Sequence, residues 1–572
     1  EPDFLFLLPV LLLKNRYFFL KNSILFSTYE NFVFCPPGIC YFIQKFVMSP
    51  LFFKLFFLVT FLCLTGHNAV ALAQSPAPNS SNIEIDNEDL NEKATESITA
   101  SIDSQFGIIV ENMANVLFWE PVKAVPIPLI VIILLCGSIF FTIYHNWLNI
   151  RGFKHAIDIT RGRYDNPDDP GEISHFQALT SALSATVGLG NIAGVAVAIQ
   201  TGGPGAVVWM MLIGLLGMTA KFNECTLAMV YRKVRPDGTV DGGPMHYLEI
   251  GLQERGFPFP VAKCFGLVFA IFCIGGSFGG GNMFQANQAT SAVRGMIGDR
   301  PGLDWFFGGL LAFLVGLVII GGIKRIGQVT EKIIPLMCGI YVLAGIIILI
   351  LHANQIPEAA VLIVRSCVSP EAAYGGFIGV LVQGIRRAVF SNEAGVGSAA
   401  IAHAAAKTDE PVREGMVAML GPFIDTVVIC TMTALVVIVS GAYNTPEAGK
   451  GVEMTRWAFS ETLSWFPTVL NISVFLFAYS TMISWSYYGE KAWQYIFGTT
   501  KKAIIIYRIL FLGFIVLGAV ASLENVITFS DLMILSMAFP NIIGGVILAP
   551  RVKVLLQDYW RRYKANEFTV YE

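Results

Sequence analysis

Two stretches, Ser184-Ala-Thr-Val-Gly-Leu-Gly-Asn-Ile-Ala-Gly194 and Phe390-Ser-Asn-Glu-Ala-Gly-Val-Gly397, decide the fold of this chain. Each lies in the middle of an apolar, membrane-length segment, and both contain the pattern Asn-x-Ala-Gly. Glycine weakens a helix there, and lipid offers no water to satisfy the backbone groups that a break sets free. Matching interruptions in two halves of a membrane protein indicate the central site of a transporter.

The composition favours a polytopic membrane protein. Hydrophobic residues make up 54% of the chain and charged residues only 14%, against roughly 25% charged in soluble domains. The ten cysteines show no Cys-x-x-Cys pair and no Cys/His ligand spacing, so neither a resident metal nor a disulfide framework is predicted. No HExxH, GxSxG or GxxxxGK[ST] motif occurs, which argues against an enzyme. We expect no cofactor and no nucleic-acid partner.

The N-terminal region reads as a processing signal. The first methionine is Met48, and it is followed by Lys54, an apolar run and the sequence Ala71-Leu-Ala73. This order predicts a secretory signal peptide over 48–73. Residues 1–47 are then interpreted as non-native upstream translation, although residues 3–34 can also be read as an extra membrane segment. The acidic stretch 74–104 predicts a flexible exported tail, within a region 74–123 that leads to the membrane.

Apolar segments of about 20 residues predict eleven membrane spans. They lie at 124–146, 176–199, 204–230, 261–290, 304–322, 332–352, 373–398, 414–441, 465–490, 502–521 and 527–549. Lys and Arg concentrate in the connections that are cytoplasmic if the mature N-terminus is outside, and in the tail 550–572. The pattern therefore places the C-terminus in the cytoplasm.

The spacing of the two interruptions predicts an internal repeat within the transporter domain 124–549. They fall in the second and seventh spans, which leaves one leading helix at 124–146 and two units of five spans, 176–352 and 373–549. A unit with an odd number of spans must be inserted upside down relative to its copy. We therefore expect a 5+5 inverted repeat with one extra leading helix.

In the first unit, Gly188, Gly190 and Asn191 lie at the expected bilayer midplane. An unwound stretch there exposes carbonyl groups to a cation and amide N–H groups to a carboxylate. The alternative is a surface of small residues that packs helices closely.

In the second unit, Phe390 and Ser391 lie where the chain is expected to open at the site. Ionisable residues within a span are functional candidates. We interpret Arg386, Arg387 and Glu393 as an internal ion pair or gate near the cytoplasmic end, rather than as ligand contacts.

Two further spans carry polar candidates. Asn282 and Gln285 share one helix face, and their amides can hold a substrate or only bridge helices. The hydroxyls of Ser480 and Thr481 suit Na⁺, and Trp485 offers a bulky lid on the same face as Thr481. Hydroxyl bonding within the helix and aromatic packing are the alternatives.

Two other polar features are interpreted as structural. Lys221 and Glu224 are expected to neutralise each other near a cytoplasmic span end. His403 is expected at the membrane interface rather than in a proton relay.

These motifs resemble the alanine/glycine:cation symporter family, bacterial carriers of small neutral amino acids. The resemblance rests on Ala185-Thr-Val-Gly-Leu-Gly-Asn-Ile-Ala-Gly, Thr201-Gly-Gly-Pro-Gly-Ala, Gly242-Gly-Pro-Met and Phe390-Ser-Asn-Glu-Ala-Gly-Val-Gly-Ser-Ala. It implies an all-α, leucine-transporter-type fold. It implies Na⁺ between the Ser184 and Val187 carbonyls and the Ser480 and Thr481 hydroxyls. The substrate is expected against Gly188, Leu189, Gly190, Asn191, Asn282, Gln285, Phe390, Ser391 and Trp485. The signal peptide and exported tail depart from the family pattern.

The sequence thus predicts a symporter of the bacterial inner membrane that imports alanine, glycine or a similar amino acid with Na⁺ by alternating access. An H⁺-coupled symporter of the same fold and a passive channel remain alternatives.

Overall fold

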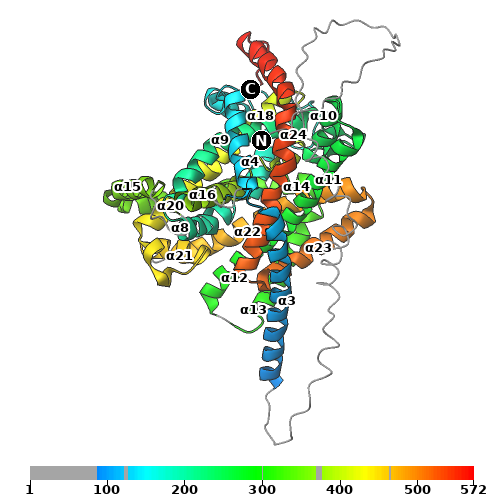
Figure 1. Cartoon of the computed structure of the whole chain (residues 1–572). Coiled ribbons are helices and arrows are strands. Elements are labelled where there is room, and N and C mark those ends of the chain that lie inside the picture. The colour runs from blue at the N-terminus through cyan, green and yellow to red at the C-terminus, as the bar shows by residue number, and fades with distance from the viewer. Residues whose placement is uncertain (1–86, 122–126, 299, 369–375, 463–465, 572) are drawn as a thin grey trace, which may run out of the picture. The chain divides into compact units, whose positions relative to one another are not determined.

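The computed structural model describes residues 87–121, 127–298, 300–368, 376–462 and 466–571. The predicted upstream segment 1–47, the signal peptide 48–73 and the tail residues 74–86 lie outside this range. Helices dominate the described chain (Figure 1). A small antiparallel sheet pairs β1 (Lys233–Val234) with β2 (Val240–Asp241), Lys233 lying opposite Asp241.

One group of helices follows the predicted spans. In the first half they are α4 (Leu129–Tyr144), α7 (His175–Thr186), η3 (Gly190–Gly194), α8 (Val195–Gly202), α9 (Ala206–Val230), α11 (Phe259–Phe278), η4 (Gly279–Met283), α12 (Phe284–Ile297), α13 (Leu303–Ile319) and α14 (Gly322–Leu351). In the second half they are α16 (Gly376–Asn392), α17 (Ala399–His403), α18 (Pro411–Ala418), α19 (Leu420–Pro422), η6 (Phe423–Cys430), α20 (Thr431–Val439), α22 (Phe466–Phe497), α23 (Lys501–Val520) and α24 (Leu523–Lys564).

The remaining elements connect these helices or precede them. These are α3 (Asn87–Leu117), α5 (Leu148–Arg151), α6 (Phe153–Thr160), α10 (Pro244–Glu254), η5 (Ala353–Gln355), α15 (Ile356–Ser366), η7 (Ala442–Asn444), η8 (Pro446–Ala448) and α21 (Val452–Ser460).

The chain is a multi-pass membrane protein. Within the described residues, seven helices are long and apolar enough to cross a membrane, and the bent pair α7 with η3–α8 makes an eighth. The helices α4 and α13 are apolar but shorter, and α16 carries Arg386 and Arg387. A helix thus lies at each of the eleven predicted spans, while the number of crossings and the inverted repeat stay predictions.

Burial separates the helices of the interior from those at the periphery. Helix α24 (orange to red in Figure 1) contacts α4, α11 and α16, which come from both halves of the chain. By contrast, Phe306 of α13, Leu336 of α14 and Ile509 of α23 are 72%, 61% and 64% exposed. Large apolar side chains that point outward on three neighbouring helices fit a lipid-facing surface.

The segment from Asn87 onward differs from the expected flexible tail, because it forms the helix α3. The carboxylate of Asp103 accepts hydrogen bonds from the Ser522 backbone N–H (2.8 Å) and from Asn525 Nδ2 (3.0 Å). Phe106 is buried against Phe529, with ring centroids 5.4 Å apart. Tertiary packing against the start of α24 therefore overrides the polar composition that predicted disorder.

We expect Asp103→Ala to loosen α3 without disturbing the helix bundle. The substitution leaves the Ser522 N–H without its acceptor, which costs about 1–3 kcal/mol, whereas Asn525 Nδ2 keeps the Asp103 backbone carbonyl at 3.1 Å. Limited proteolysis of the purified protein should then cleave α3 faster than in the wild type. Glu111→Ala, an exposed acid on the same helix, is the control. Equal cleavage rates in both variants would contradict the anchoring role of Asp103.

Candidate functional site

The first interruption breaks a helix at the predicted residues. Helix α7 begins with a capping box between Ser174 and Gln177 and ends at Thr186, and the helix axis turns by 51° before it continues. In the break, the backbone N–H of Gly188 donates to Asn191 Oδ1 at 2.9 Å. The side chain of Asn191 thereby satisfies a backbone group that the lost helical turn sets free, as a membrane interior requires.

The glycines of this break allow two close approaches. A Cβ atom on Gly188 would collide with the hydroxyl of Thr481, and one on Gly190 would lie 3.3 Å from Ser391 Cα. Gly190 therefore brings the first interruption directly against the second. These close approaches fit the alternative interpretation of a helix-packing surface, and the 51° bend shows that the helix is also interrupted here.

The second interruption begins after Asn392, at the end of α16. Glu393, Gly395 and Gly397 have φ angles of 55°, 83° and 91°, in the left-handed region that stops a helix. Asn392 Oδ1 accepts from the Ala394 N–H at 2.9 Å, and the amine of Lys221 donates to the Asn392 carbonyl at 2.9 Å. Side chains again supply the partners that the helix no longer provides.

A buried carboxylate that the sequence analysis missed joins the two breaks. Asp425 Oδ2 accepts from Asn191 Nδ2 at 2.7 Å, and Asp425 Oδ1 accepts from Ser391 Oγ at 2.8 Å. Thr426 Oγ1 donates to the same carboxylate at 2.7 Å, and Cys430 lies 3.3 Å from Asn191 Nδ2. An available signal was the lone acid in the apolar run Phe423-Ile-Asp-Thr-Val-Val-Ile-Cys430, which marks a functional residue by default.

Lys221 and Glu224 interact electrostatically, as expected, but their direct hydrogen bonds go elsewhere. The Lys221 amine donates to the Asn392 carbonyl, and Glu224 accepts from Asn541 Nδ2 at 2.9 Å. Lys221 is 1% exposed and interacts electrostatically with Glu224, Glu393 and Asp425. Because α9 packs against α16, α17 and η6, the Lys221 amine faces several acids rather than one partner.

Most of the predicted substrate residues lie around the breaks. Gln285 Oε1 accepts from the Leu189 N–H at 3.4 Å, and Phe390 packs edge-on against Phe284 with centroids 5.2 Å apart. Asn282 is directed elsewhere, since its Nδ2 donates to the Phe511 carbonyl at 2.7 Å. The amides of Asn282 and Gln285 thus play different parts, the first bridging to α23 and the second facing the break.

The residues predicted to hold Na⁺ connect α7 with α22. Ser184 Oγ donates to the Ser480 carbonyl at 2.8 Å, and Thr481 Oγ1 donates to the Ser184 carbonyl at 2.9 Å. The hydroxyl of Ser480 donates to Phe477 within its own helix at 3.0 Å. Val187 follows the end of α7 with an extended backbone. The oxygen atoms of Ser184 and Thr481 therefore meet at the first break, and their role toward an ion stays a prediction.

The predicted gate does not form as one unit. Arg386 and Arg387 both pair with Asp531 of α24, Arg386 at 2.9 Å. Glu393 accepts instead from Trp485 Nε1 at 2.9 Å and from Ser398 Oγ at 2.5 Å. The two arginines lie on α16 before the break. Glu393 lies within the break, where the chain leaves the helix, and its side chain therefore reaches a different partner. Trp485, expected as a lid, is tied to the second break through Glu393.

A second polar cluster holds the segments 170–173 and 404–408 together. The guanidinium of Arg232 donates to the carbonyls of Ala404 (2.8 Å), Ala406 (2.6 Å), Pro170 (2.9 Å) and Thr408 (2.5 Å). The two segments also pair directly, Lys407 N–H to the Ile173 carbonyl at 2.7 Å. We call this arrangement the Arg232 clamp. It joins the segment before α7 to the segment that follows α17. The clamp therefore links the two broken helices at a distance from the breaks themselves.

His403 lies beside the clamp and corrects another expectation. It is fully buried, where an interfacial position was expected, and its Nδ1 lies 2.5 Å from Glu414 Oε1. The other oxygen of Glu414 contacts His175. Glu414 thus connects α7, α17 and α18, a tertiary contact that the sequence spacing does not reveal.

Comparisons with known proteins agree with the motifs. A model of the sodium:alanine symporter family matches residues 110–572. The sodium/alanine symporter AgcS of Methanococcus maripaludis is 41% identical over 77% of this chain and 94% of its own. The "Probable sodium/glutamine symporter GlnT" of Bacillus subtilis is 34% identical over 81% and 92%. The crystal structure of MhsT in complex with L-phenylalanine superposes with a TM-score of 0.49, at 18% identity, over 66% of this chain and 89% of that one.

We expect Arg232→Gln to open the clamp. The variant loses charge-assisted hydrogen bonds, each worth about 1.5–3 kcal/mol, to carbonyls on both segments. Amide hydrogen exchange of peptides covering 170–173 and 404–408 should accelerate by about tenfold or more. The matched control is Lys233→Gln, because Lys233 is an exposed neighbour of the same charge. Unchanged exchange in Arg232→Gln would show that the segment pairing stands without the guanidinium.

Proposed function

Because this chain belongs to the sodium:alanine symporter family, a family of transporters, we propose that it imports alanine, glycine or a similarly small neutral amino acid together with Na⁺. The observation that carries the proposal is the meeting of two broken helices at one buried carboxylate, Asp425. Broken helices at membrane depth offer helix-end dipoles of both signs to a zwitterion and to a cation. The expected location is a bacterial inner membrane, with the C-terminus in the cytoplasm.

The walls of the site support a small substrate. Phe390 and Trp485 stand beside Gly280 and Gly281, where added Cβ atoms would collide with Ile534 and with the indole. Gly188 and Gly190 leave no side chain of their own in the break. Bulky rings on one side and bare backbone on the other favour a substrate with a methyl group or hydrogen as its side chain.

Two sets of oxygen atoms support cation coupling. One is the predicted set of Ser184, Val187, Ser480 and Thr481, and the other surrounds Asp425. Hard cations prefer oxygen ligands, and a carboxylate at the second set adds the negative charge that a buried cation needs. A cation bound beside Asp425 stabilises the arrangement in which both breaks lie together. It thereby completes the surface that the amino acid contacts.

H⁺ coupling is the second candidate, and a specific observation favours it. Asp425 and Glu393 are buried carboxylates at the breaks, and a buried acid can take up a proton instead of a metal ion. The coupling ion therefore has to be measured.

Transport by alternating access assigns roles to the two polar clusters. The Arg232 clamp lies on the side expected to be cytoplasmic. The pairing of Arg386 and Arg387 with Asp531 precedes the break on α16 and so lies on the side expected to be outer, not near the cytoplasmic end as the sequence analysis expected. Opening the clamp separates α7 from α17 and releases both solutes inward. Closing it again restores the outward-facing form.

Uptake of labelled L-alanine into proteoliposomes tests the proposed function. We expect accumulation above equilibrium under an inward Na⁺ gradient and none under an inward K⁺ gradient. Accumulation driven by a pH gradient alone would assign H⁺ as the coupling ion. Downhill flux that ignores both gradients would indicate a channel, and absence of alanine flux in folded protein would overturn the substrate assignment.

We expect Asp425→Asn to abolish Na⁺-driven accumulation, because the amide keeps the size of the side chain but removes its negative charge.

Thr481→Val should raise the Na⁺ concentration for half-maximal uptake by about tenfold, the effect of losing roughly 1.4 kcal/mol of binding. Thr201→Val, which removes an exposed hydroxyl bonded within its own helix, is the control. Wild-type Na⁺ dependence in both site variants would contradict the assignment of these oxygens.

A further inference from the structure

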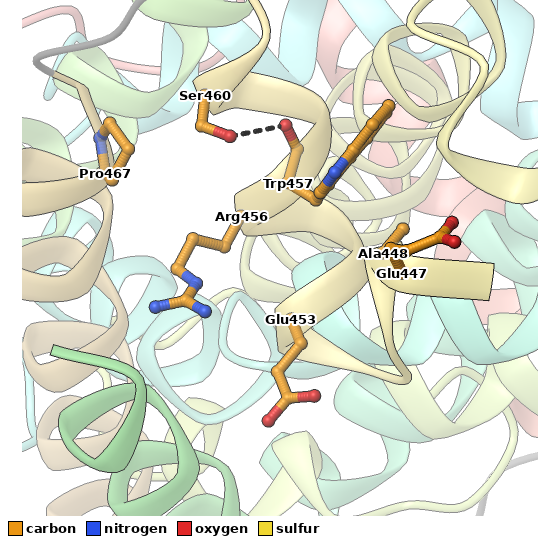
Figure 2. A pocket seen from close by; sticks show the side chains of 7 residues that line it. All are labelled: Glu447, Ala448, Glu453, Arg456, Trp457, Ser460 and Pro467. Atoms are coloured by element: carbon orange, nitrogen blue, oxygen red, sulfur yellow. Dashed lines mark hydrogen bonds between the residues drawn. The ribbon is translucent and has the colours of Figure 1, made fainter. Parts of the chain in front are cut away.

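A cavity of about 260 Å³ lies beside α21, away from the central site (Figure 2). Seven residues line it: Glu447, Ala448, Glu453, Arg456, Trp457, Ser460 and Pro467. They come from the turn η8, from α21 and from the start of α22. The lining thus combines one guanidinium, two carboxylates and one indole in a small space.

Helix α21 is bonded to the first break. Thr455 Oγ1 donates to the Ile192 carbonyl in η3 at 3.0 Å, and the Val452 N–H donates to Gln288 Oε1 at 3.1 Å. The cavity therefore opens on the helix that directly covers the broken span. The connection 442–464 is expected on the outer side by the distribution of positive charge, which places the cavity before the central site on the inward path.

The charged groups of the cavity retain capacity for a ligand. Arg456 Nη1 donates to the Gly295 carbonyl at 2.8 Å, and among the described residues Arg456 has no ion-pair partner. Glu453 Oε1 accepts from Ser291 Oγ at 3.0 Å, and Glu447 is exposed. Figure 2 shows the guanidinium of Arg456 and the carboxylate of Glu453 on the same side of α21, with the Trp457 indole on the other side near Glu447.

This combination selects the chemistry of the ligand. A guanidinium binds a carboxylate with two parallel hydrogen bonds, and a carboxylate accepts from an ammonium group. A simple anion is repelled by two glutamates, and a simple cation leaves Arg456 unused. A molecule that carries both groups satisfies both.

We propose that this cavity is an outer binding site for the zwitterion of a small amino acid, which captures the substrate before it reaches the two breaks. Arg456 binds the carboxylate, and Glu453, on the same side of α21, binds the ammonium group. The proposal rests on the proposed function, because the ligand of the cavity is then the transported amino acid. The hydrogen bond from Thr455 to Ile192 connects α21, which carries the proposed site, directly to the first break.

The test compares alanine uptake kinetics from the two sides of the membrane. Right-side-out and everted vesicles that contain the full chain are assayed under Na⁺ for the wild type, Arg456→Gln and Arg365→Gln. Arg365 is an exposed arginine of α15, a connection expected on the same side, and it does not line the cavity. We expect Arg456→Gln to raise the KM about tenfold from the outside only, with kcat within about twofold, and Arg365→Gln to match the wild type.

A second variant keeps the test decisive if Arg456→Gln fails to fold. Glu453→Gln keeps the size of the side chain but removes the negative charge that binds the ammonium group, and we expect it to raise the outside KM at least threefold. Wild-type uptake with unchanged outside KM in the folded variants would overturn the outer site alone. Equal KM increases on both sides would also overturn it, because they locate the effect in the central site. Absence of Na⁺-driven uptake in the wild type would overturn the proposed function and this site together.

Discussion

The structure depends on one constraint: backbone groups at membrane depth need partners inside the protein. Two helices are interrupted next to each other, and in each interruption an asparagine side chain accepts a hydrogen bond from a backbone N–H group. Asn191 accepts from Gly188, and Asn392 accepts from Ala394. The remaining donors of Asn191 and Ser391 then converge on Asp425. The chain can therefore hold unwound backbone, with groups available to a ligand, in a region where a regular helix is expected.

This constraint also explains how the two halves of the chain are coupled. Asp425 comes from η6 in the second half and accepts from Asn191 of the first break, so that the first half depends on the second at its interruption. Lys221 adds positive charge among the acids of this region and donates to the Asn392 carbonyl. The Arg232 clamp joins the same two broken helices again at their far ends. A movement of one broken helix must therefore break contacts with the other, as a coupled transport step requires.

Local sequence predicted the elements that depend on local chemistry. The glycines and asparagines of Ser184–Gly194 and Phe390–Gly397 located both breaks, and helices lie at all predicted spans. The same motifs predicted the family, which the comparisons confirm. The expected sodium ligands and the inverted repeat stay predictions, because the first needs a bound ion and the second a comparison of the two units.

What the sequence could not predict is the choice among tertiary partners. Arg386, Arg387 and Glu393 are close in sequence, yet the arginines turn to Asp531 and the glutamate to Trp485. Asn282 turns to α23, and His403 is buried against Glu414. Each of these side chains has a partner from a distant segment, and helical spacing gives no information about which helix stands opposite. Helix α3 formed for the same reason, since its partner is the start of α24.

The most direct test of the central claim uses Cys430, whose sulfur lies 3.4 Å from Ser391 Oγ at the junction of the two breaks. In a variant that retains Cys430 as its single cysteine, modification by a small thiol-specific reagent is timed with and without ligands. If the junction is the transport site, alanine protects Cys430 when Na⁺ is present and not when K⁺ replaces it. A variant that retains only Cys136, exposed on α4, shows no such protection. Modification of Cys430 at one rate under every condition would contradict the assignment of the site to the two breaks.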